Sequence, residues 1–257
     1  MKSAERPSPL ANAPNNSARK DRAPKDTAPK TKATIAALSV LFITVVFLSV
    51  TSVNTVRASL HYYGAKNFIE EWETKGNITQ EALSAAQRSA LGAIERHSSH
   101  PLYTDTLSTI FQYQALHGGD DENAVKWLNR AEALSVKSIQ KRPAWPVTWA
   151  NLAYVKWLKG EIDPSLSEYL LKASTLGPHT PEVHTAIANI GLGMSKRYIR
   201  QFLENKALIK NHTLLGLRHP KTRASIISIA KTTQTQSLVC SWLVQAEITR
   251  YKSLNCA

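Results

Sequence analysis

The stretch from Arg142 to Gly193, RPAWPVTWANLAYVKWLKGEIDPSLSEYLLKASTLGPHTPEVHTAIANIGLG, decides the fold class that the sequence predicts. It contains three segments with apolar residues at helical spacing, separated by two short turns. The first segment fills positions i, i+3, i+4 and i+7 of one helix face with Trp149, Leu152, Ala153 and Lys156. The second has the stripe Leu166, Leu170 and Ala173, and the third repeats the first spacing with His184, Ile187, Ala188 and Gly191. The stretch therefore predicts three consecutive helices.

The prolines of this stretch indicate a repeat. Pro143 precedes Pro178 by 35 residues, which is close to the period of a helix–turn–helix repeat. Asp163-Pro164 and Thr180-Pro181 are typical helix starts, because Asp or Thr can cap free backbone amides and proline fits the first helical position. The stretch resembles about one and a half tetratricopeptide repeats, with one residue inserted near the hairpin turn.

The rest of the chain also favours helices, and we expect an all-α protein. The sequence has ten glycines and no run of alternating β-branched residues outside its N-terminal apolar segment. Thr79 can cap one helix, two more are expected to end near Gly118 and before Pro143, and a last one spans about 235–251. Their predicted inward residues are Leu83, Ala86, Ala90, Ala93 or Ile94; Leu107, Ile110, Phe111 and Gln114; Trp127, Leu128, Ala131, Leu134 and Ile139; and Leu238, Trp242, Leu243 and Ile248.

The formal net charge of +13 first suggests a nucleic-acid partner. Much of that charge lies in residues 1–32, which hold eight Lys or Arg against three acidic residues, five prolines and almost no large apolar side chain. Such a segment cannot bury enough surface to fold, so a disordered basic tail is expected. Attraction to anionic lipid headgroups accounts for the same residues, and nucleic acid is not the expected partner.

A run of 24 uncharged residues, 33–56, lies between Lys32 and Arg57. Its core, IAALSVLFITVVFLSVTSV, is long enough to cross a hydrocarbon layer about 30 Å thick as a helix. Its only polar side chains are Ser and Thr, whose hydroxyls can bond back to the helix backbone. A cleaved signal peptide is the alternative, but its apolar core would be shorter and would end in a small-x-small site. An uncleaved transmembrane anchor is therefore favoured.

The basic residues predict the orientation of this anchor. Eight of them precede it, whereas only Arg57, Lys66 and Lys75 follow within about twenty residues. The positive-inside bias places the N-terminus in the cytoplasm and residues 57–257 on the far side.

No catalytic signature is found. The sequence lacks G-x-S-x-G, H-E-x-x-H, a P-loop and a glycine-rich dinucleotide turn, so no enzyme, cofactor or metal is predicted. His97 and His100 form an H-x-x-H at a helix end, where a surface pair is expected. The run 120–122 (Asp120, Asp121, Glu122) lies on a loop, a poor geometry for acid–base work.

The two cysteines, Cys240 and Cys256, have two interpretations. In an oxidising compartment they could form a disulfide. Within one straight helix their 16-residue separation would be about 24 Å, so the bond requires the helix to end early and the tail to fold back. The alternative is a buried Cys240 and an unpaired Cys256.

Two regions are candidates for binding. Stacked hairpins make grooves lined by the first helix of each pair, here by Asn151, Tyr154 and Asn189. The segment 195–223 has Glu204 as its only acid, and its cations could attract an acidic polysaccharide or lipid headgroups, although a solvated face is the simpler interpretation. These cations are Lys196, Arg197, Arg200, Lys206, Lys210, Arg218, Lys221 and Arg223.

The segments 142–156 and 176–192, together with the basic tail and the single anchor, resemble the VpsP-like proteins encoded with bacterial exopolysaccharide biosynthesis genes. This resemblance implies a role in polysaccharide production or export, without catalytic residues. It also implies location in a bacterial inner membrane, with the C-terminal domain in the periplasm. The implied partners are other membrane proteins of a polysaccharide-assembly system.

The predicted organisation is a basic cytoplasmic tail (1–32), a transmembrane helix (33–56), a juxtamembrane helix (57–78), tetratricopeptide-like repeats (79–194) and a basic C-terminal helical segment (195–257). The function expected is that of a membrane-anchored, non-catalytic scaffold in exopolysaccharide biosynthesis or export. The alternatives are a membrane-tethered periplasmic chaperone associated with secretion and an enzyme acting on polysaccharide. The sequence predicts no oligomeric state.

Overall fold

The structure is a computed structural model that describes residues 28–119, 121–246 and 252–256. Within these residues the regular structure is entirely helical, with ten α-helices and one short 3-10 helix. Their bounds are α1 Ala28–Lys75, α2 Gln80–Arg96, α3 Pro101–His117, α4 Asp121–Lys141, α5 Pro146–Lys159, α6 Pro164–Leu176, α7 Pro181–Arg197, α8 Ile199–Arg218, α9 Pro220–Thr232, α10 Gln236–Gln245 and η1 Lys252–Leu254. The prediction of an all-α protein is confirmed.

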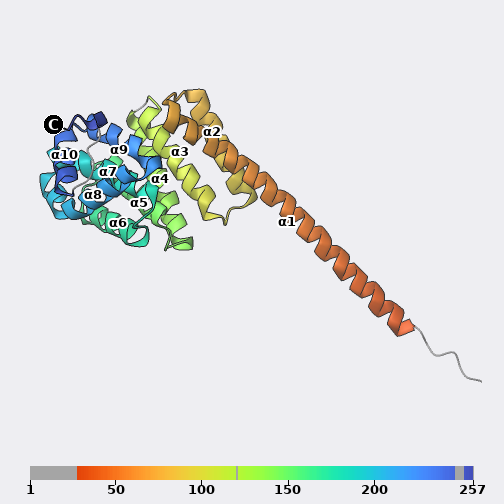
Figure 1. Cartoon of the computed structure of the whole chain (residues 1–257). Helices are drawn as coiled ribbons and strands as arrows, with labels where there is room; N and C mark the ends of the chain where they lie inside the picture. Colours follow the sequence, from red (N-terminus) through yellow and green to blue (C-terminus); the bar gives the residue numbers. More distant parts are fainter. Residues whose placement is uncertain (1–27, 120, 247–251, 257) are drawn as a thin grey trace, which may run out of the picture. The chain divides into compact units, whose positions relative to one another are not determined.

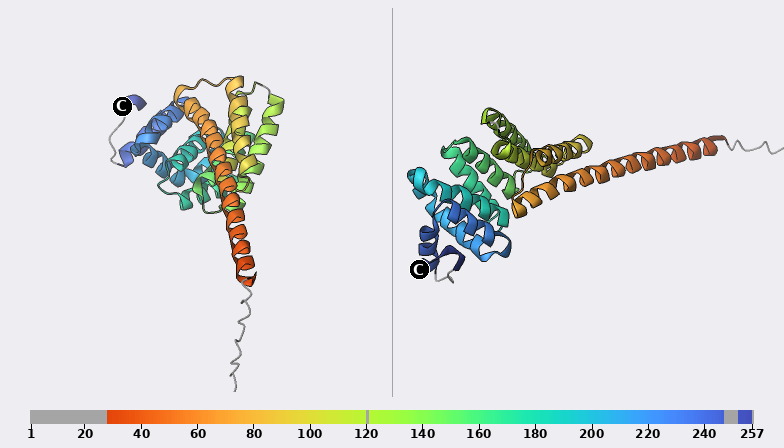
Figure 2. Two further views of the ribbon diagram at one scale, coloured as in Figure 1. Left: turned by 90° about the vertical axis from the view of Figure 1, so that its right-hand side faces the viewer. Right: turned by 90° about the horizontal axis from the view of Figure 1, so that it is seen from above.

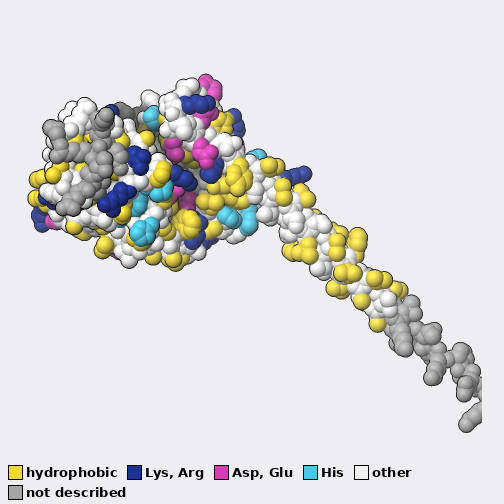
Figure 3. Space-filling model, viewed as in Figure 1, with side chains coloured by type: hydrophobic (Ala, Val, Ile, Leu, Met, Phe, Trp, Pro, Cys, Tyr) yellow, Lys and Arg dark blue, Asp and Glu magenta, His cyan; other side chains and the backbone are white. Residues whose placement is uncertain are grey.

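The chain divides into two compact units, Met1–Val50 and Thr51–Ala257. In the first unit, most of the predicted basic tail lies outside the described residues, and α1 begins at Ala28, five residues before the predicted start. The large apolar side chains of α1 from Ile35 to Val56 are 44–70% exposed, and Figure 3 shows them as hydrophobic atoms along the helix. The hydroxyls of Ser39, Thr44 and Ser49 donate to the carbonyls four residues earlier. By length and composition this segment fits a membrane span or a signal sequence.

The second unit is built from antiparallel helical hairpins (Figures 1 and 2). The C-terminal part of α1 packs against α2, with His61 opposite Gly92 and Gly64 opposite Ser89. After this pair, α3 packs on α4, α5 on α6 and α7 on α8, while α9 and α10 pack on α8 and on each other. The hairpins are also joined to one another, because α4 contacts α5 and α5 contacts α7.

Prolines start the first helix of four successive pairs. Pro101, Pro146, Pro181 and Pro220 occupy the first positions of α3, α5, α7 and α9, at intervals of 45, 35 and 39 residues. Proline fits there because the first amides of a helix have no partner within the helix. The predicted Asp163 cap is present, since its Oδ1 accepts from the Leu166 amide at 3.1 Å, but the Thr180 side chain makes no cap hydrogen bond.

The buried residues agree closely with the predicted helix faces. Leu83, Ala86, Ala90 and Ala93 of α2 are buried, as are all four predicted residues of α3. The inward stripes of α5, α6 and α7 are also buried, apart from the half-buried Trp149. On α4 the prediction holds for Leu128 and Ala131, whereas Trp127, Leu134 and Ile139 are half-buried.

The C-terminal third differs most from the predicted layout. The boundary predicted at 194/195 falls inside α7, which continues to Arg197 and forms a hairpin with α8. The last α-helix ends at Gln245 rather than near residue 251, and Ile248 lies outside the described residues. The predicted C-terminal segment therefore begins within the last turn of α7, and α8 is the second helix of that hairpin.

Candidate functional site

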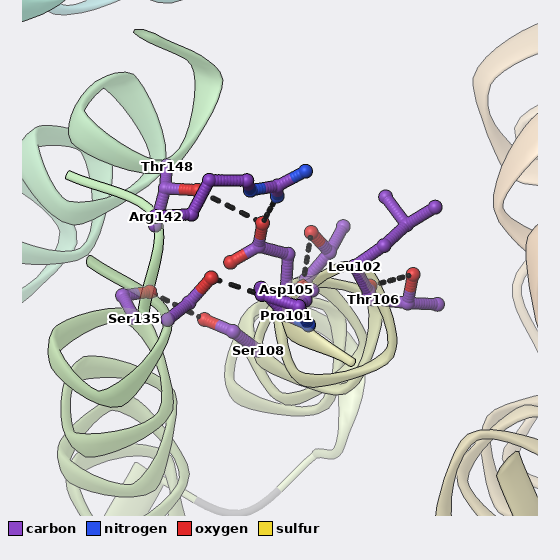
Figure 4. A network of polar contacts seen from close by, with 10 residues as sticks. Pro101, Leu102, Asp105, Thr106, Ser108, Ser135, Arg142 and Thr148 are labelled. Atoms are coloured by element: carbon purple, nitrogen blue, oxygen red, sulfur yellow. Dashed lines mark hydrogen bonds and ion pairs between the residues drawn. The ribbon is translucent and has the colours of Figure 1, made fainter. Parts of the chain in front are cut away.

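A buried polar network joins α3 to the start of α5 (Figure 4). The carboxylate of Asp105, a buried residue of α3, accepts hydrogen bonds at Oδ2 from Arg142 Nη2 at 2.6 Å and from Thr148 Oγ1 at 2.8 Å. The Arg142 guanidinium also lies over the Trp145 ring, 4.3 Å from its centroid, and Trp149 Nε1 donates to the Pro143 carbonyl at 2.7 Å. These polar and aromatic residues of the RPAWPVTW segment hold one hairpin against the next.

The same network continues between α3 and α4. Ser108 Oγ contacts Ser135 Oγ at 2.8 Å and donates to the Ala131 carbonyl at 2.8 Å. Burial raises the pKa of Asp105 above its ordinary value, while the nearby Ser138 hydroxyl, the hydrogen bond from Thr148 and the Arg142 charge act in the opposite direction. Because the charges of Arg142 and Asp105 pair with each other inside the protein, the network has a structural role.

An ion-pair network fixes the turn between α5 and α6. Lys156, predicted on the inward face of α5, is only 7% exposed, and its Nζ lies 2.8 Å from Glu161 and 2.9 Å from Asp163. Burial disfavours the charge of Lys156, but these two carboxylates outweigh that effect and raise its pKa. Lys159 contacts Glu161 at 2.7 Å and Glu132 of α4 at 2.7 Å, so the turn is also tied to the preceding hairpin.

The residues predicted to line a groove lie on neighbouring first helices. The side chain of Tyr154 in α5 lies close enough to Asn189 in α7 for Asn189 to influence the Tyr154 pKa, and Asn151 precedes Tyr154 by one helical turn. Tyr113 of α3 lies near Tyr154. Burial raises the pKa of Tyr113, and the nearby Glu73 and Tyr154 add to that rise. All four side chains are half-buried, so each keeps some contact with solvent. We call these residues, Tyr113, Asn151, Tyr154 and Asn189, the inner band.

The end of α1 borders this inner band. The Trp72 ring packs on the Tyr113 ring with centroids 4.8 Å apart. Glu73 follows Trp72 in α1. The pKa of Glu73 is raised by burial and by the nearby carboxylates of Glu70 and of Glu182 in α7. The inner band is thus flanked by acidic side chains from α1 and α7.

The eight cations of the basic segment are not gathered at one site. Three flank the start of α8 (Lys196, Arg197, Arg200), two lie within it (Lys206, Lys210), and three lie around its end (Arg218, Lys221, Arg223). A helix of 20 residues is about 30 Å long, so the first and last groups are far apart. Several are engaged internally: Lys196 donates to Gln234, Lys210 to Gln245, and Arg200 pairs with Glu204. The structure thus gives a dispersed set of charges.

The cysteines form a disulfide in the structure. Cys240 in α10 and Cys256 after η1 are bonded, with their Cα atoms 5.5 Å apart. Because α10 ends at Gln245, the chain can turn back, and the buried Leu254 and partly buried Cys256 pack against the core of α7–α10.

A histidine pair was not predicted from the sequence. His184 of α7 and His212 of α8 are buried, their Nδ1 atoms lie 2.8 Å apart, and His212 Nε2 lies 2.8 Å from Ser174 Oγ of α6. Burial, together with His184 and His179, lowers the pKa of His212 to about 4, and burial also lowers the pKa of His184. The helical spacing of the sequence predicted that His184 faces inward, but no feature of the sequence predicted its contact with His212.

The described residues contain no group of three or more His, Cys, Asp or Glu side chains that could hold a metal ion. His97 and His100 are half-buried with ring centroids 5.5 Å apart, and His100 stacks on Tyr103. The loop predicted for the acidic run 120–122 is wrong for Asp121 and Glu122, which form the first turn of α4, and Asp120 lies outside the described residues. Comparison with protein-family models and with curated proteins gave no match.

Proposed function

We propose that this chain is a single-pass membrane protein whose helical-hairpin domain binds partner proteins. The observation that carries the proposal is the apolar part of α1, where thirteen large side chains from Ile35 to Val56 are exposed. At about 1.5 kcal/mol or more for each side chain, leaving them in water is unfavourable by on the order of 20 kcal/mol. A hydrocarbon layer removes that cost, and the hydroxyls of Ser39, Thr44 and Ser49 already have backbone partners.

The residues after the apolar run favour an anchor over a cleaved signal. α1 continues without a break to Lys75, and Ala58, two residues after Val56, is buried beside Ala93 and Tyr103. The apolar helix therefore leads directly into the core of the hairpin domain. The positive-inside bias places that domain on the far side of the membrane, which is the periplasm in the bacterial inner membrane that the VpsP-like resemblance implies.

The hairpin domain has the features of a tetratricopeptide-like array. Four first helices start with proline, and consecutive hairpins contact each other through α4 with α5 and α5 with α7. Arrays of this kind present the first helices to a partner. The inner band places aromatic rings beside Asn carboxamides, each of which can donate and accept hydrogen bonds, so it suits the backbone of a bound protein segment.

We infer a scaffold role in polysaccharide production or export, with membrane enzymes or exporters of that system as partners. The internal pairing of Arg142 with Asp105 supports a structural role for the RPAWPVTW segment. The test is crosslinking and co-purification of the tagged full-length chain from membranes. Recovery of a polymerase, glycosyltransferase or exporter is expected, and recovery of none would contradict the scaffold.

Paired variants make this test specific. Tyr154→Ala/Asn189→Ala should abolish recovery of the partner, because it removes two neighbouring polar side chains of the inner band, one from α5 and one from α7. Glu168→Ala/Leu171→Ala changes two exposed residues of α6 and should leave recovery unchanged. Crosslinks spread over many secreted chains, with polysaccharide unaffected by deletion of the protein, would favour the chaperone alternative.

A further inference from the structure

A shallow cleft of about 370 Å³ lies between α1 and α2 and is lined by Arg57, Leu60, His61, Ser89 and Arg96. The two helices are antiparallel, and small residues bring them close together. A Cβ at Gly92 would lie 2.8 Å from His61 Nδ1, and a Cβ at Gly64 would lie 3.6 Å from Ser89 Oγ. This register places Arg57 and Arg96 on facing ends of the same pair. Two arginines 39 residues apart in the sequence thus meet at one cleft.

The cleft is strongly basic and has unused donors. Arg57 and Arg96 are exposed, and no carboxylate of the described residues is within ion-pair distance of either guanidinium. Arg96 Nη1 donates to the Gly92 carbonyl at 2.9 Å, which orients the guanidinium and leaves its other N–H groups available. The Ser89 hydroxyl adds another donor to the lining. Arginine pairs and a hydroxyl are the groups that bind phosphate oxygens best.

The surroundings of the cleft indicate a lipid rather than a free anion. Arg57 is the first charged residue after the 24 uncharged residues of α1. Leu60 in the cleft is 67% exposed and the nearby Val56 is 59% exposed. A headgroup layer extends about 5–7 Å beyond the hydrocarbon on each side, a distance covered by about four residues of helix. Residues 57–61 therefore fall at the level of lipid phosphates if residues 33–56 span the hydrocarbon.

We propose that the cleft binds the phosphate of an anionic phospholipid in the leaflet next to the hairpin domain. The phosphate lies between the Arg57 and Arg96 guanidiniums and Ser89 donates to it, while the exposed Val56, on the hydrocarbon side of Arg57, contacts the lipid's acyl region. Because Arg57 and Arg96 come from different helices, a bound lipid joins the anchor to the first hairpin. This inference rests on the membrane span of the proposed function.

The test uses the full-length chain in nanodiscs of phosphatidylcholine, with and without phosphatidylglycerol, and measures the Tm of the hairpin domain by tryptophan fluorescence. A ligand that binds only the folded state raises Tm, so phosphatidylglycerol should raise Tm by about 3 °C. Arg57→Gln/Arg96→Gln should lose most of that rise. Arg88→Gln/Lys126→Gln removes the same charge from exposed positions outside the cleft and should retain it.

Three results would overturn the proposal: an unchanged rise in the cleft variant, an equal loss in the control variant, or the same rise with inorganic phosphate in phosphatidylcholine discs. An unchanged rise in the cleft variant would show that the lipid does not bind in the cleft. An equal loss in the control variant would show that the rise depends only on net charge, and the same rise with inorganic phosphate would show that the ligand is free phosphate. A chain that does not enter nanodiscs at all contradicts the membrane span, whereas a chain that enters without any response to phosphatidylglycerol contradicts only the lipid site. Circular dichroism of each variant confirms that it folds.

Discussion

Asp105 of α3 and Thr148 of α5 are joined by a 2.8 Å hydrogen bond across 43 residues of sequence, and Arg142 donates to the same carboxylate oxygen. One buried carboxylate thus connects two successive hairpins. Both donors belong to the segment RPAWPVTW, which the sequence singled out for its tryptophans and prolines. The segment is the joint between hairpins, and its unusual composition reflects that role.

Removing the Asp105 carboxylate should strongly lower the free energy of unfolding. Asp105→Ala leaves the mostly buried Arg142 guanidinium and the Thr148 hydroxyl without their shared acceptor, and should lower the free energy of unfolding by about 3 kcal/mol. Asp105→Asn keeps one acceptor oxygen and should cost less. Denaturation of the chain in detergent, followed by tryptophan fluorescence, measures both.

The exposed pair Arg200–Glu204 provides the control for Asp105. Its side chains are 85% and 54% exposed, so Glu204→Ala should change the free energy of unfolding by less than about 0.5 kcal/mol. If Asp105→Ala lowers the free energy of unfolding no more than Glu204→Ala does, the network does not hold the hairpins together.

The histidine pair predicts a stability that depends on pH. The pKa of His212 is 6.5 in the unfolded chain and about 4 in the folded protein. Above pH 6.5 the residue is neutral in both states and its contribution is complete. As pH falls from 6.5 towards 4, the unfolded chain binds a proton that the folded protein does not, and stability decreases by about 3 kcal/mol in total.

A substitution isolates this effect from the titration of carboxylates. His212→Asn should give a flatter dependence of unfolding free energy on pH between 6.5 and 4 than the natural chain, whatever its absolute stability. His117→Gln changes an exposed histidine at the end of α3 and should leave the slope unchanged. Equal slopes for all three proteins would show that the buried pair does not titrate as the structure indicates.

Gly191 and Gly64 should respond differently to substitution by alanine. A Cβ at Gly191 would lie 2.5 Å from Ile209 Cγ1 and Cγ2, so Gly191→Ala should cost about 1–2 kcal/mol despite the better helix propensity of alanine. At Gly64 the nearest atom is 3.6 Å away, so Gly64→Ala should be neutral or stabilise by up to about 1 kcal/mol. Thermal unfolding of both variants checks the contrast.

A second substitution tests the contact between Gly191 and Ile209 itself. Ile209→Ala removes the atoms that the new Cβ would meet, so Gly191→Ala should cost less in that background than in the natural chain. Strict additivity of the two changes would mean that α7 and α8 do not meet at this point.

The fold was largely predictable because it depends on local patterns, and the remaining features depend on which helices meet. Proline starts such as Pro146 and Pro181 and the apolar stripes predicted the helices and their buried faces. Ile209 of α8 and Trp157 of α5 fill the space beside Gly191 and Gly193 of α7. Those partners come from other helices, so the sequence alone did not show that α7 continues into a hairpin with α8.

The candidate site was predictable only in part, for the same reason. Placing Asn151, Tyr154 and Asn189 on the first helices required only helix periodicity. The approach of His184 to His212, and of Arg57 to Arg96, requires the register between two helices. The basic residues of 195–223 are close in sequence, but the length of α8 separates them in space.

The disulfide predicts a response to reductant. Loss of the bond between Cys240 and Cys256 should destabilise the protein by up to about 3 kcal/mol, as expected for a loop of this size. Dithiothreitol should therefore lower the Tm of the natural chain and leave that of Cys240→Ser/Cys256→Ser unchanged. Without reductant, neither thiol should react with an alkylating reagent under denaturing conditions. Two reactive thiols in the untreated protein would contradict the bond.

Alkaline carbonate extraction of membranes that contain the full-length chain tests the membrane span, on which the proposed function depends. The protein should remain in the membrane pellet at its full length of 257 residues. Leu41→Arg/Phe47→Arg should weaken retention, because each arginine near the centre of a span costs about 2.5–3.5 kcal/mol. Release of the natural chain into the soluble fraction, or a product shortened by removal of the apolar segment, would contradict the anchor and the scaffold role that rests on it.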